Sequence, residues 1–203
     1  MKKSSFLAWI YRMPLIQRWG LMHCFKSENI AEHSHQVSVN AHLLILIKNK
    51  HFGGDLDPGH AALLGIYHES SETRLTDIVS PTKYDNPEFT RQFKELEAIT
   101  EKDCVNSLPE EFKSELEPLI IQSKINEEYK NLLKAADLLA AYIKTIDELR
   151  YGNSEFKQVK INLENKLDAI KTNLPEVEYF INTFIDDCGL TLDKLVESSK
   201  KTI

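Results

Sequence analysis

The sequence predicts a compact, all-α fold in which one domain spans residues 1–203. Apolar side chains recur every three to four positions through most of the chain, which is the period of a helix with one buried face. Proline stands at the start of several of these periodic segments, where a helix tolerates it best. No stretch alternates apolar and polar residues for long enough to indicate a strand, and no internal repeat divides the chain.

The N-terminal segment is expected to form one short helix and then an irregular stretch. The helix ends near Met13, and the serines before its first apolar residues are candidate N-caps. Residues 14–28 follow without helical periodicity and contain the adjacent pair Arg18 and Trp19. The segment begins like a signal peptide, but Arg12 interrupts its apolar run, so we interpret it as part of the fold.

A second helix is expected from about Asn29 to Lys50. Its apolar positions follow the helical period and include Val37, Ala41, Leu44 and Ile47. His33 lies four residues before Val37, and residues four apart share one face of a helix. We therefore expect the His33 imidazole to point inward.

A third helix is expected from Asp57 to about Ser70. Asp57 is a favourable N-cap, and Pro58 suits the first position of a helix. The apolar run 61–67 then ends at His68. A second imidazole is thus predicted at the end of a buried helix.

The segment after this helix is predicted to be a loop, and helices are predicted for the rest of the chain. Polar and turn-prone residues dominate 71–85, and Pro81 is expected to break any helix there. Glu72 and Asp77 would then lie on or near the loop. Further helices are expected at 87–105, 109–122, 127–150, 154–172, 175–185 and in a short stretch after Thr191.

Asp137 stands inside an unusually apolar part of the chain. The run 132–141 is apolar around most of a helix circumference, so the helix that carries it is expected to be buried. An unpaired carboxylate there would cost several kcal/mol. A metal ion, an arginine or a hydrogen-bonding cluster must therefore meet Asp137.

His33, His68 with Glu69, and Asp137 come from three separate segments, and together they predict a metal site. Two imidazoles and two carboxylates are the ligand types that fix a divalent transition metal, such as Co, Mn, Zn, Fe or Ni, while leaving positions for water and substrate. Taken singly, a buried histidine is more often a satisfied core residue, and a buried aspartate is more often an ion-pair partner. Three buried polar groups on different helices need one shared explanation, and this favours metal-dependent hydrolysis.

Composition restricts the partners and the compartment. The 25 basic and 31 acidic residues give a formal net charge of −6 without a basic stripe, so we expect no binding of long nucleic acid. Three widely spaced cysteines outside any CxxC pattern suggest free thiols in a reducing compartment. The longest apolar run is too short to cross a membrane. We therefore expect a cytoplasmic protein that does not bind membranes.

The order His33, then His68 followed by an acid, then Asp137 resembles the HD-domain metal-dependent phosphohydrolases, whose signature is H…HD…D. The chain resembles the bacterial 5′-deoxynucleotidases of that superfamily more closely, and the resemblance spans about the whole chain. The residues that carry it are Arg18-Trp19, Glu32-His33-Ser34, Tyr67-His68, Ser71-Glu72, Asp77, Pro81, Lys83-Tyr84 and Ala135-Ala136-Asp137.

This resemblance implies a homodimeric enzyme that hydrolyses deoxyribonucleoside 5′-monophosphates with one divalent transition metal. It implies that the metal ligands are His33, His68, Glu69 and Asp137. Among the remaining site residues, it implies that Glu72 handles the proton of the attacking water, unless it is only a solvated loop carboxylate. Arg18 would bind the phosphate and take part in catalysis.

The resemblance also implies a sugar-binding part of the site. Trp19 would stand against C2′ of the sugar and reject a ribose, unless it is only a core anchor. Asp77 and Ser80 would belong to the segment that surrounds the sugar, with Asp77 a candidate acceptor for the 3′-hydroxyl.

Two departures from the family pattern keep other readings open. The family has aspartate where this chain has Glu69, and it tends to have a glycine-containing turn where this chain has residues 73–76. Glu69 leaves open a catalytically impaired nucleotide-binding relative, although its carboxylate can still bind an ion. A deoxynucleoside triphosphate triphosphohydrolase of the same superfamily is the other alternative. Release of phosphate, of triphosphate or of neither product would distinguish the three.

Overall fold

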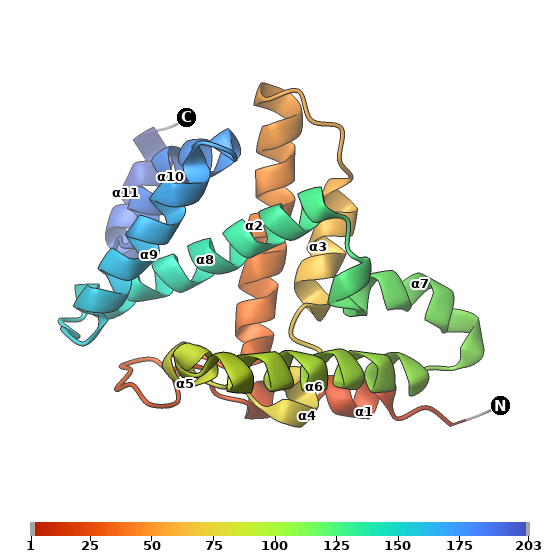
Figure 1. Ribbon diagram of the computed structural model, residues 1–203. Helices are drawn as coiled ribbons and strands as arrows, with labels where there is room; N and C mark the ends of the chain where they lie inside the picture. The colour runs from red at the N-terminus through yellow and green to blue at the C-terminus, as the bar shows by residue number, and fades with distance from the viewer. Residues whose placement is uncertain (1–2, 202–203) are drawn as a thin grey trace.

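The computed structural model describes residues 3–201, and within them it confirms the all-α prediction (Figure 1). The described residues form helices and no strand, apart from one isolated antiparallel bridge between Gln17 and Asn29. In chain order the elements are α1 (Phe6–Ile10), η1 (Met13–Leu15), α2 (Ile30–His51), α3 (Pro58–Tyr67), α4 (Glu72–Leu75), α5 (Ser80–Asp85), α6 (Pro87–Asn106), α7 (Glu110–Ile120), η2 (Gln122–Lys124), α8 (Glu127–Arg150), α9 (Phe156–Lys171), α10 (Pro175–Cys188) and α11 (Leu192–Lys201).

Helix α2 is the centre of the fold. It packs against α3, α8 and α10, and α8 in turn packs against α9. In Figure 1, α8 crosses α2, while α9, α10 and α11 gather on one side of the molecule. The short helices α1, α4 and α5 lie with α6 beyond the N-terminal end of α2. This end of α2, where α3 also finishes, is enclosed by several segments that are far apart in the sequence.

The core consists of the inward faces of α2, α3, α8, α9 and α10. The apolar period predicted for the second helix is confirmed, since its expected inward positions are buried. Residues of this core that are at most 2 % exposed include Val37, Leu44, Leu64, Leu132, Leu139, Leu167, Val177 and Phe180. Because α2 is covered on several sides, its polar residues on those sides need partners.

Gly65 lets α2 and α3 approach until their backbones touch. A Cβ atom on Gly65 would lie 2.5 Å from the Cα atom of Ser38 and 2.7 Å from its amide nitrogen, so no side chain fits there. The Ser38 hydroxyl donates a 2.8 Å hydrogen bond to the Ala62 carbonyl across the same contact. His33 lies five residues before Ser38, and His68 lies three residues after Gly65. The close contact therefore brings the two imidazoles together.

The prediction of a loop at 71–85 was partly wrong. Helices α4 and α5 both lie in this segment, and Pro81 occupies the first turn of α5 instead of preventing it. A helix begins readily at proline, because its first amides have no intrahelical partner to lose. The helix expected to reach Ser70 ends earlier, at Tyr67, with His68 as its C-cap.

Two expectations concerned the whole chain, namely its relation to membranes and its domain bounds. None of the helices in residues 3–201 is long and apolar enough to span a membrane. The predicted domain bounds of 1–203 extend past the described residues by two positions at each end, and they stay a prediction.

We predict that Gly65→Ala lowers the free energy of unfolding by about 1–3 kcal/mol, the usual range for overpacking a close contact. The added methyl group would collide with the backbone of Ser38, which has no rotamer to change. Denaturant-induced unfolding would measure the effect. Gly20→Ala is the control, since a Cβ atom at Gly20 meets nothing within 4 Å. Equal stability of both variants would show that α2 and α3 separate without cost.

Candidate active site

The candidate site lies where α2 begins and α3 ends. Asn29 caps α2, and its side chain accepts hydrogen bonds from the amides of Ala31 and Glu32. This cap fixes the first turn of the helix. His33 follows on the second turn, is fully buried as predicted, and points towards the end of α3.

His68 is oriented by a backbone contact. Its Nδ1 atom lies 2.7 Å from the Gly65 carbonyl, so that nitrogen carries the proton and donates the hydrogen bond. Its Nε2 atom is then left with a lone pair and has no hydrogen-bond partner in the described structure. The rings of His33 and His68 are 5.3 Å apart between centroids. The two imidazoles therefore form one cluster.

Glu69 and Asp137 place carboxylate oxygens beside these imidazoles. Glu69 Oε1 lies 3.2 Å from His68 Nε2 and 3.9 Å from His33 Nε2. One ligand atom from each of His33, His68 and Glu69 lies within 4.8 Å of the others. Asp137 Oδ1 on α8 lies 3.0 Å from His33 Nε2 and so joins the cluster through that imidazole. The structure thus brings the four predicted ligands together.

Asp137 differs in one respect from the sequence-based expectation. Its helix is buried as expected, with Ala136 and Leu139 fully enclosed, but the Asp137 side chain is 43 % exposed. The carboxylate lies at an opening of the core, although burial still opposes its ionisation. Burial raises the pKa of Asp137, but the contact with His33 outweighs this effect and holds the pKa below its usual value.

The donor set fits a divalent transition metal. The Nε2 atoms of His33 and His68 are buried and lack well-formed hydrogen bonds, although carboxylate oxygens are close to both. Burial opposes ionisation of Glu69, but His68, His33 and Arg18 outweigh it and hold the pKa of Glu69 well below its usual value. Neutral imidazole nitrogens and ionised carboxylates are the states in which these residues bind metal.

Glu72 and Asp77 lie beside this cluster on the segment that follows α3. Glu72 opens α4, and its Oε2 atom is buried without a hydrogen bond. Burial, with the nearby carboxylates of Glu69 and Asp77, raises the pKa of Glu72. Burial likewise raises the pKa of Asp77. Thr76 between them has φ 66° and ψ 166°, a conformation that is essentially confined to glycine.

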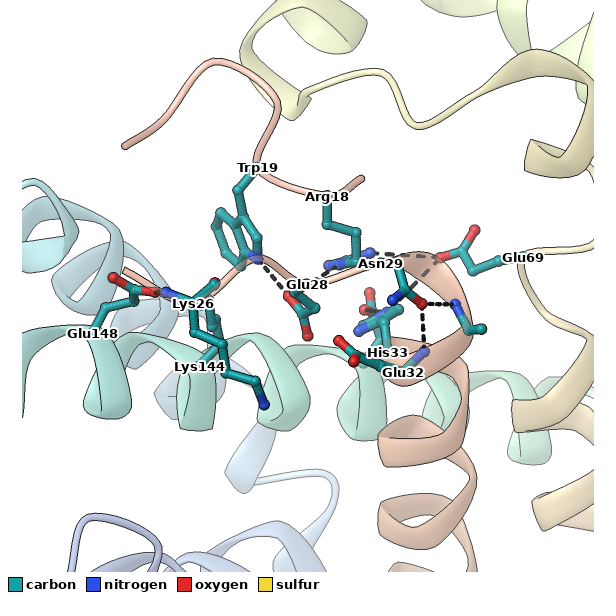
Figure 2. Close-up of polar contacts among 12 residues, drawn as sticks. Arg18, Trp19, Lys26, Glu28, Asn29, Glu32, His33, Glu69, Lys144 and Glu148 are labelled. Carbon is teal, nitrogen blue, oxygen red and sulfur yellow. Dashed lines mark hydrogen bonds and ion pairs between the residues drawn. The ribbon is translucent and has the colours of Figure 1, made fainter. Parts of the chain in front are cut away.

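Arg18 and Trp19 approach the cluster from the irregular N-terminal segment (Figure 2). Arg18 Nη1 lies 4.0 Å from Glu69 Oε1, and the guanidinium is 5.8 Å from the centre of the Trp19 ring. The indole packs at 5.3 Å from the ring of Phe156, and Trp19 has φ 60°. Arg18 is therefore close to the candidate metal ligands, with Trp19 beside it.

One of the predicted site residues is not connected to the others. Ser80 is exposed in the first turn of α5 and makes no polar side-chain contact with the described part of the cluster.

Glu28, by contrast, was not predicted as a site residue, yet it contacts both Arg18 and Trp19. It is 5 % exposed, and its Oε2 atom lies 2.5 Å from Trp19 Nε1 and 3.5 Å from Arg18 Nε. In the sequence it stands in a polar stretch that looks like solvated loop, so no periodicity marks it.

Comparison with known proteins agrees with the predicted family. The model of the 5′-deoxynucleotidase YfbR-like family matches residues 5–188. A 5′-deoxynucleotidase of Vibrio atlanticus is 46 % identical over 195 residues, which are 96 % of this chain and 100 % of the relative. The 5′-deoxynucleotidase YfbR of Escherichia coli is 40 % identical over 199 residues, which are 98 % and 99 % of the two chains.

Solved structures show the same fold. An HD-domain phosphohydrolase from Listeria innocua superposes with a TM-score of 0.78 at 18 % identity and covers 98 % of both chains. An HD phosphohydrolase of cyanophage S-2L, solved with dA and one catalytic Zn²⁺ ion, has a TM-score of 0.66 at 18 % identity. The similarity covers 88 % of this chain and 95 % of the phage protein.

We predict that Asp137→Ala abolishes stoichiometric binding of a divalent transition metal, because it removes the ligand contributed by α8. Equilibrium dialysis followed by elemental analysis would measure metal per chain. Asp147→Ala is the matched control, since Asp147 is a half-buried carboxylate on the same helix and outside the cluster. Full metal occupancy in the Asp137 variant would place the metal elsewhere.

Proposed function

The chain belongs to the YfbR-like family of 5′-deoxynucleotidases, and we propose from its site how it hydrolyses deoxyribonucleoside 5′-monophosphates. It is a phosphoric monoester hydrolase of the HD-domain type, as its resemblance predicted, and its products are a deoxyribonucleoside and phosphate. The observation that carries the proposal is the cluster of His33, His68, Glu69 and Asp137 with Glu72 beside it.

The four clustered side chains would hold one divalent transition metal. The buried Nε2 atoms without hydrogen bonds and the two ionised carboxylates support this assignment. Such an ion supplies Lewis acidity, which offsets the charge of the phosphate and makes a nearby water a better nucleophile at neutral pH. The Gly65 carbonyl contact on His68 keeps its Nε2 atom directed at the other candidate ligands.

Glu72 is proposed to accept the proton of the attacking water, once the charge of a bound cation offsets the burial and the neighbouring carboxylates that raise its pKa. Its carboxyl group is buried next to Glu69, and its Oε2 atom has no competing hydrogen bond. The water attacks phosphorus, the bond to the 5′-oxygen breaks, and the proton taken by Glu72 is then available for that leaving oxygen. The loop carboxylate considered from the sequence would be solvated, whereas Glu72 is largely enclosed.

Arg18 and Trp19 are proposed to bind the two ends of the substrate's sugar phosphate. The guanidinium of Arg18 offers a planar set of donors to phosphate oxygens, and it lies 4.0 Å from a candidate metal ligand. The indole of Trp19 would stand against C2′, where a ribose 2′-hydroxyl finds no space and no partner. Its neighbour Phe156 anchors the ring from behind.

The remaining sugar contacts are also part of the proposal. Asp77 lies near enough to Arg18 and Glu69 for their charges to affect its pKa, which supports a role at the 3′-hydroxyl. Ser80 has weaker support, since it is exposed on α5. The homodimer and the cytoplasmic location stay predictions. Analytical ultracentrifugation of the full chain would determine the oligomeric state.

Glu69 is proposed to be a working ligand in spite of its extra methylene group. Its Oε1 atom reaches within 3.2 Å of His68 Nε2 and 3.9 Å of His33 Nε2, so the longer stem is accommodated inside the cluster. A site in decay would have no reason to keep the other three ligands and Glu72 assembled around it. This argues against the impaired nucleotide-binding relative.

We predict that the metal-loaded wild type releases inorganic phosphate from deoxyribonucleoside 5′-monophosphates. Glu72→Gln should lower turnover on the order of 10²-fold while metal content is kept, because the amide cannot take a proton. Product analysis and steady-state kinetics with each deoxynucleotide would measure both. Release of triphosphate from deoxynucleoside triphosphates as the main activity would favour the triphosphohydrolase. An unchanged turnover number would return Glu72 to a structural role.

We predict that Glu69→Asp keeps metal stoichiometry and leaves kcat/KM within about tenfold, or 1.4 kcal/mol of barrier. The shorter carboxylate remains in reach because His33 and His68 stay fixed by the contact between α2 and α3. The same metal and kinetic assays apply. An inert wild type beside an active Glu69→Asp variant would show that Glu69 marks a decayed site.

A further inference from the structure

We propose that Glu28 is a positioning residue that sets the sugar specificity of this enzyme by holding the indole of Trp19 in place. Its Oε2 atom accepts a 2.5 Å hydrogen bond from Trp19 Nε1 (Figure 2). The inference rests on the proposed function, in which Trp19 rejects a ribose. It adds a residue that would not touch the substrate and would act only through the ring.

The backbone around Glu28 is tied directly to that of Arg18 and Trp19. The Arg18 amide donates a 2.9 Å hydrogen bond to the Glu28 carbonyl, and the Ile30 amide donates a 3.0 Å bond to the Ile16 carbonyl. Residues 16–18 and 28–30 thus form a short antiparallel pairing around the bridge between Gln17 and Asn29. Glu28 therefore faces the start of the Trp19 side chain from a fixed position immediately before α2.

The indole needs such a partner because the backbone alone does not orient it. Trp19 has φ 60°, and it lies in a tight turn in which the Met22 amide donates to the Trp19 carbonyl. The ring packs on Phe156 on one side, which fixes its distance from α9 but leaves rotation in its own plane. A hydrogen bond to the ring nitrogen removes this freedom.

Glu28 can supply this bond because it is itself enclosed and anchored. Its side chain is 5 % exposed, and among the described residues its carboxylate accepts a hydrogen bond from the indole. Arg18 Nε lies 3.5 Å from the same oxygen, which balances its charge. Glu28 also lines a cavity of about 120 Å³ together with Lys26 and Lys144. Because the Glu28 carboxylate is buried and held in place, its hydrogen bond fixes the position of the indole N–H group.

The loop between Trp19 and Glu28 is held from the other side by α8. The amides of Phe25 and Lys26 donate to the Glu148 carboxylate at 2.9 and 3.2 Å. Lys144 donates to the Lys26 carbonyl at 2.5 Å and also pairs with Glu148. Because these contacts hold the loop without Glu28, removing the Glu28 side chain should loosen the indole and leave the loop in place.

The test compares deoxyribo- and ribonucleotide hydrolysis in two Glu28 variants. Glu28→Gln keeps an acceptor oxygen at the same distance, whereas Glu28→Ala removes it. We expect Glu28→Ala to lower the ratio of kcat/KM for the deoxy- and ribonucleotide of one base by about tenfold, the size expected for one hydrogen bond to a charged acceptor. We expect Glu28→Gln to keep most of the ratio. A purely structural role would change stability and not this ratio.

Trp19→Phe provides the reciprocal variant, since it keeps a ring and removes the N–H donor. We expect it to lower the ratio as Glu28→Ala does, and we expect the double variant to show no further loss. Glu155→Gln is the control. Glu155 is an exposed carboxylate that accepts a bond from the His23 amide of the same loop and touches neither Arg18 nor Trp19.

A second measurement uses tryptophan fluorescence to detect how firmly the Trp19 ring is held, without any substrate or metal. The chain has two tryptophans, so Trp9→Phe leaves Trp19 as the only indole emitter. We expect acrylamide to quench this emission more strongly in Glu28→Ala than in the parent or in Glu28→Gln. Unchanged quenching together with an unchanged sugar ratio in a folded, active Glu28→Ala variant would overturn the proposal, as would equal losses of the ratio in Glu28→Ala and Glu28→Gln.

Failure of the proposed enzymatic activity can be distinguished from failure of the proposal about Glu28. A wild type that hydrolyses no deoxyribonucleoside monophosphate would overturn the proposed activity, and the quenching measurement would still support or overturn the contact between Glu28 and Trp19. If Glu28→Ala does not fold, Trp19→Phe decides instead. A sugar ratio unchanged in Trp19→Phe would show that the N–H donor, and therefore Glu28, does not set specificity.

Discussion

The backbone contact between Ser38 and Gly65 is the constraint on which the site depends. It fixes how closely α2 and α3 approach, since any side chain at Gly65 would overlap with the backbone of Ser38. His33 and His68 are placed on either side of this contact and reach each other with centroids 5.3 Å apart. A wider helix pair would carry the same two histidines and bring neither to a shared ion. The geometry of the candidate ligands is thus a consequence of helix packing.

Helix α8 extends this constraint from the candidate metal ligands to the loop between Trp19 and Glu28. Asp137 meets His33 near the middle of the helix, and Glu148 holds the loop before α2. They are eleven residues apart, about 16 Å along a helix axis. Because a packed helix does not change length, the Asp137 carboxylate and the Glu148 anchor of the loop after Trp19 keep a fixed separation. The candidate metal ligands and the loop after Trp19 therefore share one rigid element, although they come from different parts of the sequence.

The sequence alone predicted the long helices and the side chains that cluster as candidate metal ligands, because both leave periodic or compositional marks. Histidines and an aspartate in apolar helices need an explanation, and one bound ion would explain all of them. The residues that were missed leave no such mark. Glu28 lies in a polar stretch and becomes buried only when the loop folds back on α8. Pro81 was interpreted as a helix breaker, because proline at the start of a helix and proline in a loop look alike without a clear capping residue.

The segment 72–77 shows how contacts elsewhere maintain a strained arrangement at the site. Thr76 takes a conformation that costs about 1–3 kcal/mol for a residue with a side chain. Outside the site, Arg74 lies over the Trp9 ring at 4.8 Å, a cation–π contact worth about 0.5–2 kcal/mol.

Arg74 also pairs with Asp103 at 3.7 Å, which adds at most about 1 kcal/mol for an ion pair this exposed. Together these contacts are comparable to the strain, so α1 and α6 can hold α4 in a conformation that its own sequence disfavours. A glycine at position 76 would reach the same conformation without strain. In this chain the positions of Glu72 and Asp77 therefore depend on Arg74, a residue that touches neither of them.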